Sequence, residues 1–170
     1  MIAYRKLYSK DIDDYYDYLN QLDTETDFMM FEPKERELKV GKEKIAGWLK
    51  NANKNGDFLL VATDNRKIIG HISAEKGKVN RTAHSAYIVL GVLKDYRGRG
   101  IGTEFFKRLD VWAQENRIVR LELSVATNND AAIHLYQKNG FEVEGRKVKT
   151  MLVKGQYRDE YIMAKIREIF

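Results

Sequence analysis

The feature that most constrains the fold is a glycine-rich turn that follows an apolar run. Residues 86–93 read AYIVLGVL, and shortly afterwards glycine stands at positions 98, 100 and 102. Glycine lets the backbone turn tightly and pass close to a ligand. Successive N–H groups in such a turn form a concave anion site, and the start of a following helix adds a favourable dipole. Because Arg97 and Arg99 add positive charge, the turn predicts a phosphate or pyrophosphate site.

Two common nucleotide-binding patterns are excluded at this turn. A dinucleotide fingerprint requires G-x-G-x-x-G, but Thr103 stands where the third glycine would be needed. A P-loop requires Gly-Lys followed by Ser or Thr, and that sequence is absent. A tight strand-to-helix turn without a ligand is the remaining alternative, and three glycines with two arginines argue against it.

Hydrophobic periodicity predicts an α/β (α+β) chain with the element order β-α-α-β-β-β-α-β-α-β-β. We expect strands over residues 2–7, 58–63, 67–79, 82–93, 119–125, 141–154 and 156–166. We expect helices over residues 10–22, 42–53, 100–116 and 130–139. Ser9 is the expected cap of the first helix, and residues 23–38 are expected to be irregular or to form a short helical turn. The length of 170 residues suits one domain, residues 1–170.

The charge of the chain is unevenly distributed. Residues 1–40 hold ten acidic and six basic side chains, a net charge of −4. Since the whole chain has a net charge of +5, residues 41–170 carry +9. A basic body suits a polyanionic partner, such as a phosphorylated cofactor or a nucleic acid, and an acidic start suits a cationic one. The alternative is that both charged regions are solvent-exposed surfaces that bind no charged partner. No nucleic-acid-binding motif or aromatic stacking platform accompanies the basic residues, which argues against a nucleic-acid partner.

Several functions are excluded by what the sequence lacks. Without cysteine there are no disulfides and no thiol catalysis. Three scattered histidines without cysteine make a poor metal site, so we expect no metal. The first residues lack an apolar stretch long enough for a signal peptide, and residues 86–93 are too short to cross a bilayer. We therefore expect a cytoplasmic location and no membrane partner, and a homodimer remains open.

A second motif follows the turn. Residues 129–141 read NDAAIHLYQKNGF, and Arg97, Gly100 and Gly102 fit the pattern Arg/Gln-x-x-Gly-x-Gly/Ala. These segments resemble the two landmarks of the GCN5-related N-acetyltransferase (GNAT) superfamily, the second being N-x-x-A-x-x-L-Y-x-K-x-G-F. The order of elements agrees along essentially the whole chain, and residues 155–163 are similar to the final hairpin of many small bacterial members. The resemblance implies the GNAT fold, a mixed, mostly antiparallel sheet of six to seven strands flanked by about four helices.

The resemblance also implies a function. A family member transfers the acetyl group of acetyl-CoA to a primary amine by direct attack in a ternary complex. The strand before the turn is expected to carry a bulge and to splay from the next parallel strand, which leaves a gap for the pantetheine arm. The implied cofactor contacts are Leu90, Gly91, Val92, Arg97, Gly98, Arg99, Gly100, Ile101, Gly102, Thr103, Asn129 and Tyr136. Another acyl-CoA donor, or a CoA-binding sensor or scaffold without catalysis, stays an alternative.

Amine acetylation poses two proton problems. A protonated amine must lose a proton before it attacks, and the departing thiolate must gain one. Tyr136 matches the family tyrosine that serves as general acid. The base is undetermined: Glu122 and His84 are candidates, and His84 or Tyr87 could lead a water chain. A salt bridge for Glu122 and a structural role for His84 are the plain alternatives.

The acceptor pocket of the family lies between the segment after the first helix and the final hairpin. Here those segments are about residues 23–36 and 147–157. The first combines acids with aromatic residues, which suits a cationic amine. Phe28, Glu32 and Tyr87 are the expected acceptor contacts. Polyamines, peptide N-termini, lysine side chains and small-molecule amines all remain open.

Overall fold

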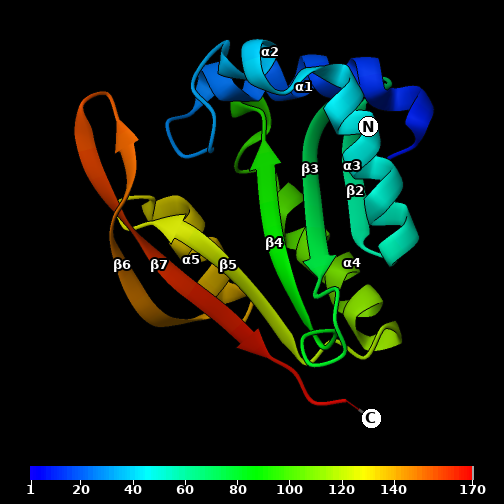
Figure 1. Ribbon diagram of the computed structural model, residues 1–170, viewed down its shortest axis with the longest axis vertical. Helices are drawn as coiled ribbons and strands as arrows, with labels where there is room; N and C mark the ends of the chain where they lie inside the picture. Colours follow the sequence, from blue (N-terminus) through cyan, green and yellow to red (C-terminus); the bar gives the residue numbers. More distant parts are fainter. Residues whose placement is uncertain (170) are drawn as a thin grey trace.

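The computed structural model describes residues 1–169, which form a seven-stranded sheet with helices on both faces (Figure 1). The strands are β1 (Ile2–Lys6), β2 (Phe58–Asp64), β3 (Lys67–Lys76), β4 (Ser85–Val92), β5 (Arg120–Ala126), β6 (Glu142–Val153) and β7 (Gln156–Ile166). The helices are α1 (Ile12–Glu25), α2 (Glu35–Lys39), α3 (Gly41–Asn55), α4 (Ile101–Glu115) and α5 (Asp130–Lys138), with 3-10 turns at Ser9–Asp11 and Lys94–Tyr96. The sheet order is β1-β2-β3-β4-β5-β7-β6, and only β4 and β5 pair in parallel. The mixed, mostly antiparallel sheet predicted from the sequence is confirmed.

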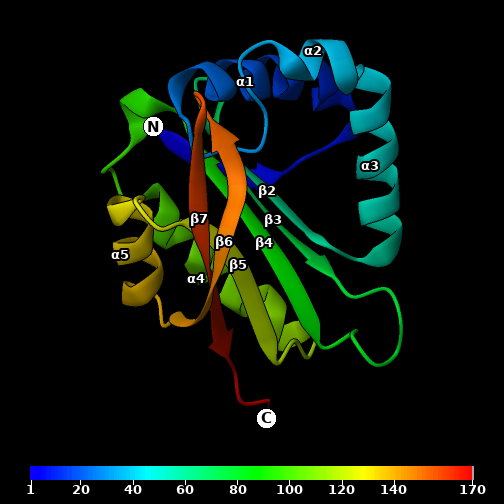
Figure 2. The same cartoon turned by 60° about the vertical axis from the view of Figure 1, so that its left-hand side comes forward.

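The helices bury apolar stripes on opposite faces of the sheet. Helices α1 and α3 cover one face, and α4 and α5 cover the other (Figures 1 and 2). In α1 the buried residues Tyr15, Leu19 and Leu22 recur at spacings of three and four, as an amphipathic helix requires. In α4 the buried residues Ile101, Phe105 and Leu109 recur at a spacing of four. None of the helices in residues 1–169 combines the length and apolarity that a membrane span needs.

The start of α1 differs from the sequence prediction. The helix begins at Ile12 and ends at Glu25, and Ser9 lies in the preceding 3-10 turn without a capping hydrogen bond. The prediction of Ser9 as the cap was therefore wrong. The carboxylate of Asp11 organises this turn instead, since it accepts the N–H of Tyr8 at 2.8 Å and two bonds from Arg5 at 2.8 and 2.9 Å. An ionised carboxylate that accepts several charge-assisted bonds prevails over a single hydroxyl.

The loop between β3 and β4 also differs from the prediction, whereas the short helical turn offered for residues 23–38 is present. The connection between β3 and β4 spans residues 77–84, so both strands are shorter than expected at this end. It is closed by bonds from the N–H of Gly77 to Ser85 O and from the N–H of Thr82 to Val79 O, both 2.9 Å. Within the segment of mixed signals, Glu35–Lys39 forms the short helix α2.

Strands β4 and β5 diverge after their first three paired residues. Their register runs from Ser85–Arg120 to Tyr87–Glu122 and then ends, although both strands continue. Figure 1 shows the gap between them widening toward their carboxyl ends. Strand β5 pairs over its whole length with β7, which draws it away from β4. The pairing of β4 with β3 has no register shift, so the bulge expected in β4 is absent from that ladder.

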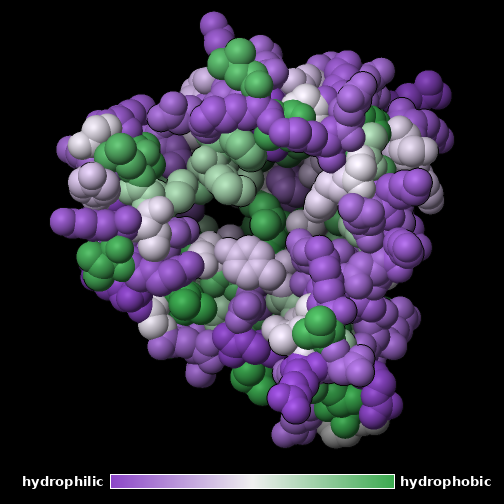
Figure 3. Space-filling view, viewed as in Figure 1, coloured by the Kyte–Doolittle hydropathy of each residue, from purple (hydrophilic) through white to green (hydrophobic). Residues whose placement is uncertain are grey.

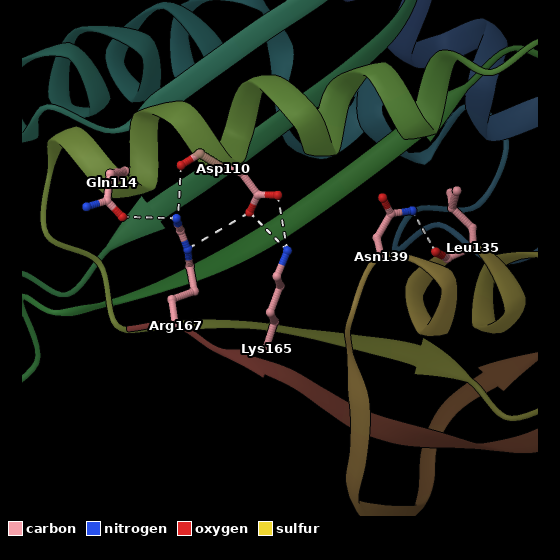
Figure 4. Close-up of polar contacts among 6 residues, drawn as sticks. All are labelled: Asp110, Gln114, Leu135, Asn139, Lys165 and Arg167. Carbon is pink, nitrogen blue, oxygen red and sulfur yellow. Dashed lines mark hydrogen bonds and ion pairs between the residues drawn. The ribbon is translucent and has the colours of Figure 1, made fainter. Parts of the chain in front are cut away.

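At the end where β4 and β5 are still paired, β7 is held by contacts with α4 (Figure 4). Lys165 donates to both carboxylate oxygens of Asp110 at 3.1 Å. Arg167, just after β7, donates to the backbone carbonyl of Asp110 at 3.2 Å and to the side chain of Gln114 at 3.4 Å. These bonds hold β7 near the start of β5, so the β6–β7 hairpin departs from β4 only toward the opposite end.

Gly91 is expected to tolerate a side chain poorly. A Cβ atom there would lie 2.6 Å from Leu22 Cδ2, 3.0 Å from His71 Cε1 and 3.2 Å from the Tyr18 hydroxyl. These groups are buried between α1 and the sheet and have little room to move. Gly91→Ala should therefore lower the free energy of unfolding by about 1–3 kcal/mol, as overpacking of a core does. Urea unfolding followed by circular dichroism measures this change.

Gly47→Ala is the matched control. Gly47 lies within α3, and a Cβ atom there would meet nothing within 4 Å. Alanine is the better helix former, so this variant should be more stable than the parent by up to about 1 kcal/mol. If both variants unfold at the parent's urea concentration, α1 does not pack on β4 as described.

Candidate active site

A cavity of about 640 Å³ lies on the α1–α3 face of the sheet, at the gap between β4 and β5. Figure 3 shows a hollow in the middle of this face, with apolar and polar residues around its rim. Its walls include residues 28–31 after α1, residues 88–90 of β4, residues 123–126 of β5, and residues Lys147 and Glu160 of the β6–β7 hairpin, and side chains of α1, α2, α3, β2, β3 and α5 also contribute. The divergence of β4 and β5 therefore creates one space that reaches from the α1–α3 face of the sheet to Tyr136 of α5.

Strand β4 presents unpaired backbone groups to this gap. In an antiparallel pair, alternate residues direct both N–H and C=O toward the partner strand. The N–H of Leu93 donates to Ile69 O at 2.9 Å, so by alternation Gly91 also faces β3, whereas Leu90 and Val92 face the gap. The carbonyl of Val92 accepts the Arg97 guanidinium at 3.1 Å. The N–H groups of Leu90 and Val92 thus remain for a ligand in the gap.

The glycine turn presents a run of free backbone donors. Gly98 and Gly100 adopt left-handed conformations, with φ of 72° and 80°, and α4 begins at Ile101. Within residues 1–169, no protein acceptor bonds the N–H groups of residues 98–103. Six consecutive donors at a helix start, with the helix dipole behind them, form an anion site of the kind that phosphates occupy. Arg97, Arg99 and Thr103 are exposed beside it.

Gly102 has a different role from the other two glycines. A Cβ atom there would lie 2.6 Å from Leu135 Cδ2. The absence of a side chain at Gly102 therefore lets α4 and α5 pack closely. That contact sets the place of α5, and with it the place of Tyr136, relative to the glycine turn.

Tyr136 lies where the cavity meets α5. It is 8% exposed, and its ring packs edge-on against Phe106, with centroids 5.8 Å apart. Burial, with a smaller contribution from nearby Tyr87, raises the pKa of Tyr136 to about 12. The hydroxyl therefore keeps its proton at neutral pH and can donate it to a developing anion. Asn129 also lines the cavity, and its Oδ1 caps α5 by accepting the N–H of Ala132 at 3.3 Å.

The wall under α1 contains a buried polar chain. The Tyr18 hydroxyl donates to Gly91 O at 2.9 Å and lies 2.7 Å from His71 Nδ1. Since Tyr18 has one hydroxyl proton, Nδ1 of His71 must carry the proton of the second bond, and Nε2 is unprotonated. Burial, together with the positive charge of Arg36, lowers the pKa of His71 to about 3. His71 therefore stays neutral, and through Tyr18 the helix α1 is tied to both β3 and β4.

The structure brings some of the predicted site residues together and separates others. Phe28, Tyr87, Leu90, Asn129 and Tyr136 line the cavity.

The predicted catalytic and acceptor residues Glu32, Glu122 and His84 are absent from the cavity wall, and so are the predicted cofactor contacts Gly91, Val92 and residues 97–103. Glu122 is bonded to Arg120 at 2.7 Å, and Arg120 also holds Glu144. His84 is exposed in the loop before β4, and its carbonyl accepts the N–H groups of Val119 and Arg120. These two candidates for the base thus lie outside the cavity wall.

The acidic residues expected around the acceptor are engaged elsewhere. Glu25 accepts the N–H of Lys94 at 2.7 Å, Asp27 pairs with Lys154 at 2.9 Å, and Glu35 pairs with Lys39 at 2.9 Å. The segment instead contributes Phe28, Met29, Met30, Phe31 and Arg36 to the cavity wall.

Sequence reasoning missed several cavity residues, namely Tyr15, Trp48, His71, Ser124 and Glu160, and it included Arg36 only as a member of the acceptor segment 23–36. The alternation of β5 was a usable signal for Ser124, because Leu121, Leu123 and Val125 are buried on the other face. No comparable pattern marks Arg36, whose place depends on the short helix α2.

The chain resembles known acetyltransferases in sequence and fold. Residues 14–141 match the acetyltransferase (GNAT) family. The L-amino acid N-acetyltransferase AaaT of Escherichia coli (strain K12) is 32% identical over 120 residues, which cover 68% of this chain and 72% of that protein. The spermidine N(1)-acetyltransferase of the same strain is 31% identical over 83 residues, which cover 48% of this chain and 45% of that enzyme. A crystal structure of an acetyltransferase of the GNAT family from Streptococcus pneumoniae aligns with a TM-score of 0.91 at 29% identity, covering 98% of this chain and 100% of that one.

Neutral, buried His71 should make the stability of the protein depend on pH. An unfolded histidine has a pKa of about 6.5, far above the folded value, so the unfolded state takes up the proton first on acidification. Stability should be greatest above about pH 6.5 and should fall as the pH drops below it. Between pH 7.5 and 5.5 we expect a loss of about 1.4 kcal/mol in the free energy of unfolding.

Urea unfolding at several pH values measures this slope. His71→Gln should flatten the slope over that range, whatever its effect on stability at pH 7.5. His84→Gln, at an exposed position, is the control and should keep the parent's slope. A parent protein whose stability is constant from pH 7.5 to 5.5 would contradict the neutral, buried state of His71.

Proposed function

Since the chain belongs to the acetyltransferase (GNAT) family, as its motifs predicted, we propose that it transfers the acetyl group of acetyl-CoA directly to a primary amine in a ternary complex. The chain is an acyltransferase, and its donor is acetyl-CoA. The observation that carries the proposal is the single cavity at the gap between β4 and β5. It extends from the free backbone edge of β4 and Tyr136 into a pocket under α1 and α2.

The donor side has a place for the pyrophosphate and for the pantetheine arm of the cofactor. The free N–H groups of residues 98–103 suit the pyrophosphate, which is a dianion at neutral pH. The pantetheine arm extends as a strand would and pairs with the free groups of Leu90 and Val92. Gly91 contributes space rather than bonds, since its backbone faces β3 and α1 packs against it.

Acetyl transfer then needs one attack and one proton donation. The lone pair of the neutral amine forms a bond to the thioester carbonyl carbon, and the carbonyl oxygen becomes an oxyanion. The backbone N–H of Leu90, which lines the cavity together with Tyr136, stabilises that oxyanion, because a fixed donor costs no reorganisation when the charge develops. When the C–S bond breaks, its electron pair leaves on sulfur. Tyr136 donates its hydroxyl proton to that thiolate, and the amine loses its extra proton to solvent or a base.

The acceptor is a small amine in this proposal. The two enzymes compared above are named for L-amino acids and for spermidine, both of which carry primary amines. Aromatic and apolar residues, among them Tyr15, Phe31 and Trp48, enclose the pocket under α1 and α2. A CoA-binding protein without catalysis would share the donor side but release no thiol when amines are added.

Tyr136→Phe tests the general acid. The change removes one hydroxyl and keeps the ring that packs against Phe106. We expect kcat to fall by about 10²-fold or more, the usual contribution of a positioned acid, and KM for acetyl-CoA to change little. Steady-state assays of free thiol release with a panel of amines give both constants.

Tyr8→Phe is the control for this experiment. Tyr8 is an exposed tyrosine that precedes α1 and lies away from the cavity. This variant should retain the parent's kcat. A Tyr136→Phe variant with the parent's kcat would remove Tyr136 from the acid role, and a parent protein that releases no thiol with any amine would overturn the proposed function.

Glu122→Gln tests the carboxylate base inferred from the sequence. Because Arg120 holds Glu122 away from the cavity wall, we expect the acidic limb of the pH profile of kcat/KM to persist in this variant. We expect kcat to change by less than about threefold, well short of the loss that follows removal of a general base. Disappearance of the acidic limb would identify Glu122 as the base after all.

A further inference from the structure

Arg36 stands at the inner wall of the cavity with only part of its guanidinium in use. It is 8% exposed, and it is held by Asp23 of α1 through bonds from Nε at 2.9 Å and from Nη2 at 3.2 Å. Its guanidinium carbon lies 4.4 Å from the centre of the Phe31 ring. The ion pair and the ring fix the plane of the guanidinium before any ligand arrives.

The remaining donors of Arg36 are open to the cavity. A guanidinium has five N–H groups, and Asp23 accepts only two of them. Within residues 1–169, the fully buried side-chain nitrogen and oxygen atoms that have no hydrogen-bond partner are Asn20 Oδ1 and Arg158 Nε. Nη1 of Arg36 has no hydrogen-bond partner in that part of the chain and is not among them, so it is accessible to solvent. Since Arg36 lines the cavity, its free edge faces the space where the acceptor would lie.

The surroundings of this edge favour an anionic group. The acidic residues of the preceding segment pair with other partners, as described above, and do not line the cavity. Lys44 and Lys147 add positive charge to the cavity wall, and Asp57, Glu75 and Glu160 add negative charge. Asp57 accepts the N–H of Lys76 at 2.9 Å, and Glu75 pairs with Lys78 at 3.3 Å. Glu160 is therefore the acid of the wall whose carboxylate has neither a hydrogen bond nor an ion pair within residues 1–169. A guanidinium edge with two parallel N–H groups matches a carboxylate in shape and charge, and it repels a second ammonium group.

We propose that the free edge of Arg36 binds a carboxylate of the acceptor, so that the acceptor is an amino acid rather than a polyamine. This inference rests on the proposed function and adds the substrate class. Asp23 then has two effects. It orients the guanidinium of Arg36, and its negative charge weakens the attraction of Arg36 for the carboxylate of the acceptor. Arg36 is a specificity-determining residue in this role and takes no part in the chemistry.

Arg36→Gln alone would not separate a loss of acceptor binding from a loss of folding. Arg36→Gln alone leaves Asp23 as a buried charge without a partner, which can unfold the protein. The double variant described next avoids this, whereas Asp23→Asn alone leaves the Arg36 guanidinium without its counter-ion, so urea unfolding first checks that this variant is folded. Asp23→Asn keeps Arg36 and removes the competing charge, and Asp23→Asn combined with Arg36→Gln replaces the ion pair with two neutral amides of similar size.

The readout is a ratio of two substrates rather than activity alone. L-leucine, L-methionine and L-phenylalanine are compared with their carboxamides, and spermidine serves as the polyamine. The parent protein should use at least one of the three acids with a kcat/KM about tenfold or more above that of its carboxamide, a typical value for a charge-assisted bond. Asp23→Asn should keep or increase this ratio. The double variant should bring the ratio to within about threefold of one, mainly through a higher KM for the acid, while KM for acetyl-CoA stays unchanged.

The outcomes separate this inference from the proposed function. A purely structural Arg36 would lower turnover of acid and carboxamide alike and leave the ratio unchanged in the double variant. A parent protein that prefers the carboxamides or spermidine would also overturn the carboxylate site, although acetyl transfer itself would stand. Absence of thiol release with every amine would instead count against the proposed function.

Discussion

Strands β4 and β5 share hydrogen bonds only as far as Tyr87 and Glu122, and the donor site depends on where that pairing stops. Beyond this point β5 belongs to the ladder with β7, and β4 belongs to the ladder with β3. Buried backbone groups must find partners, so the free edge of β4 is a site that an extended ligand can complete. The contacts of Lys165 and Arg167 with α4 keep the other end closed. The gap is thus built into the sheet rather than opened by a ligand.

The acceptor side depends on how α1 is held over the sheet. Gly91 lets α1 approach β4, and Tyr18 and His71 fasten it there with two buried bonds. The Asp23–Arg36 ion pair joins the end of α1 to α2 and positions the guanidinium at the cavity wall. A buried ion pair is weak evidence for stability, because desolvation offsets its attraction. Its retention at this place is better explained by the orientation that it gives to Arg36.

The parts of the site that are contiguous in sequence could be predicted, and the parts that depend on tertiary contacts could not. Glycine and arginine at fixed spacing specify the turn, and the segment around Tyr136 specifies its helix, because both are local signals. Glu122 was placed on the correct strand, but its partner Arg120 is shared with Glu144 of β6, a contact that no local pattern reveals. Arg36 and His71 became visible only once α1, α2 and β3 were brought together.

The central claim is that the diverging edge of β4 and the amides of the glycine turn hold acetyl-CoA. It is tested most directly by following the backbone amide signals of isotope-labelled protein in nuclear magnetic resonance spectra during titration with acetyl-CoA. The account predicts the largest changes at the N–H groups of residues 98–103, Leu90 and Val92, which have no protein acceptor. Residues of β1 and β2, on the far side of the sheet order, should change little. Saturable binding with changes confined to β1 and β2, and none at residues 98–103, would contradict it.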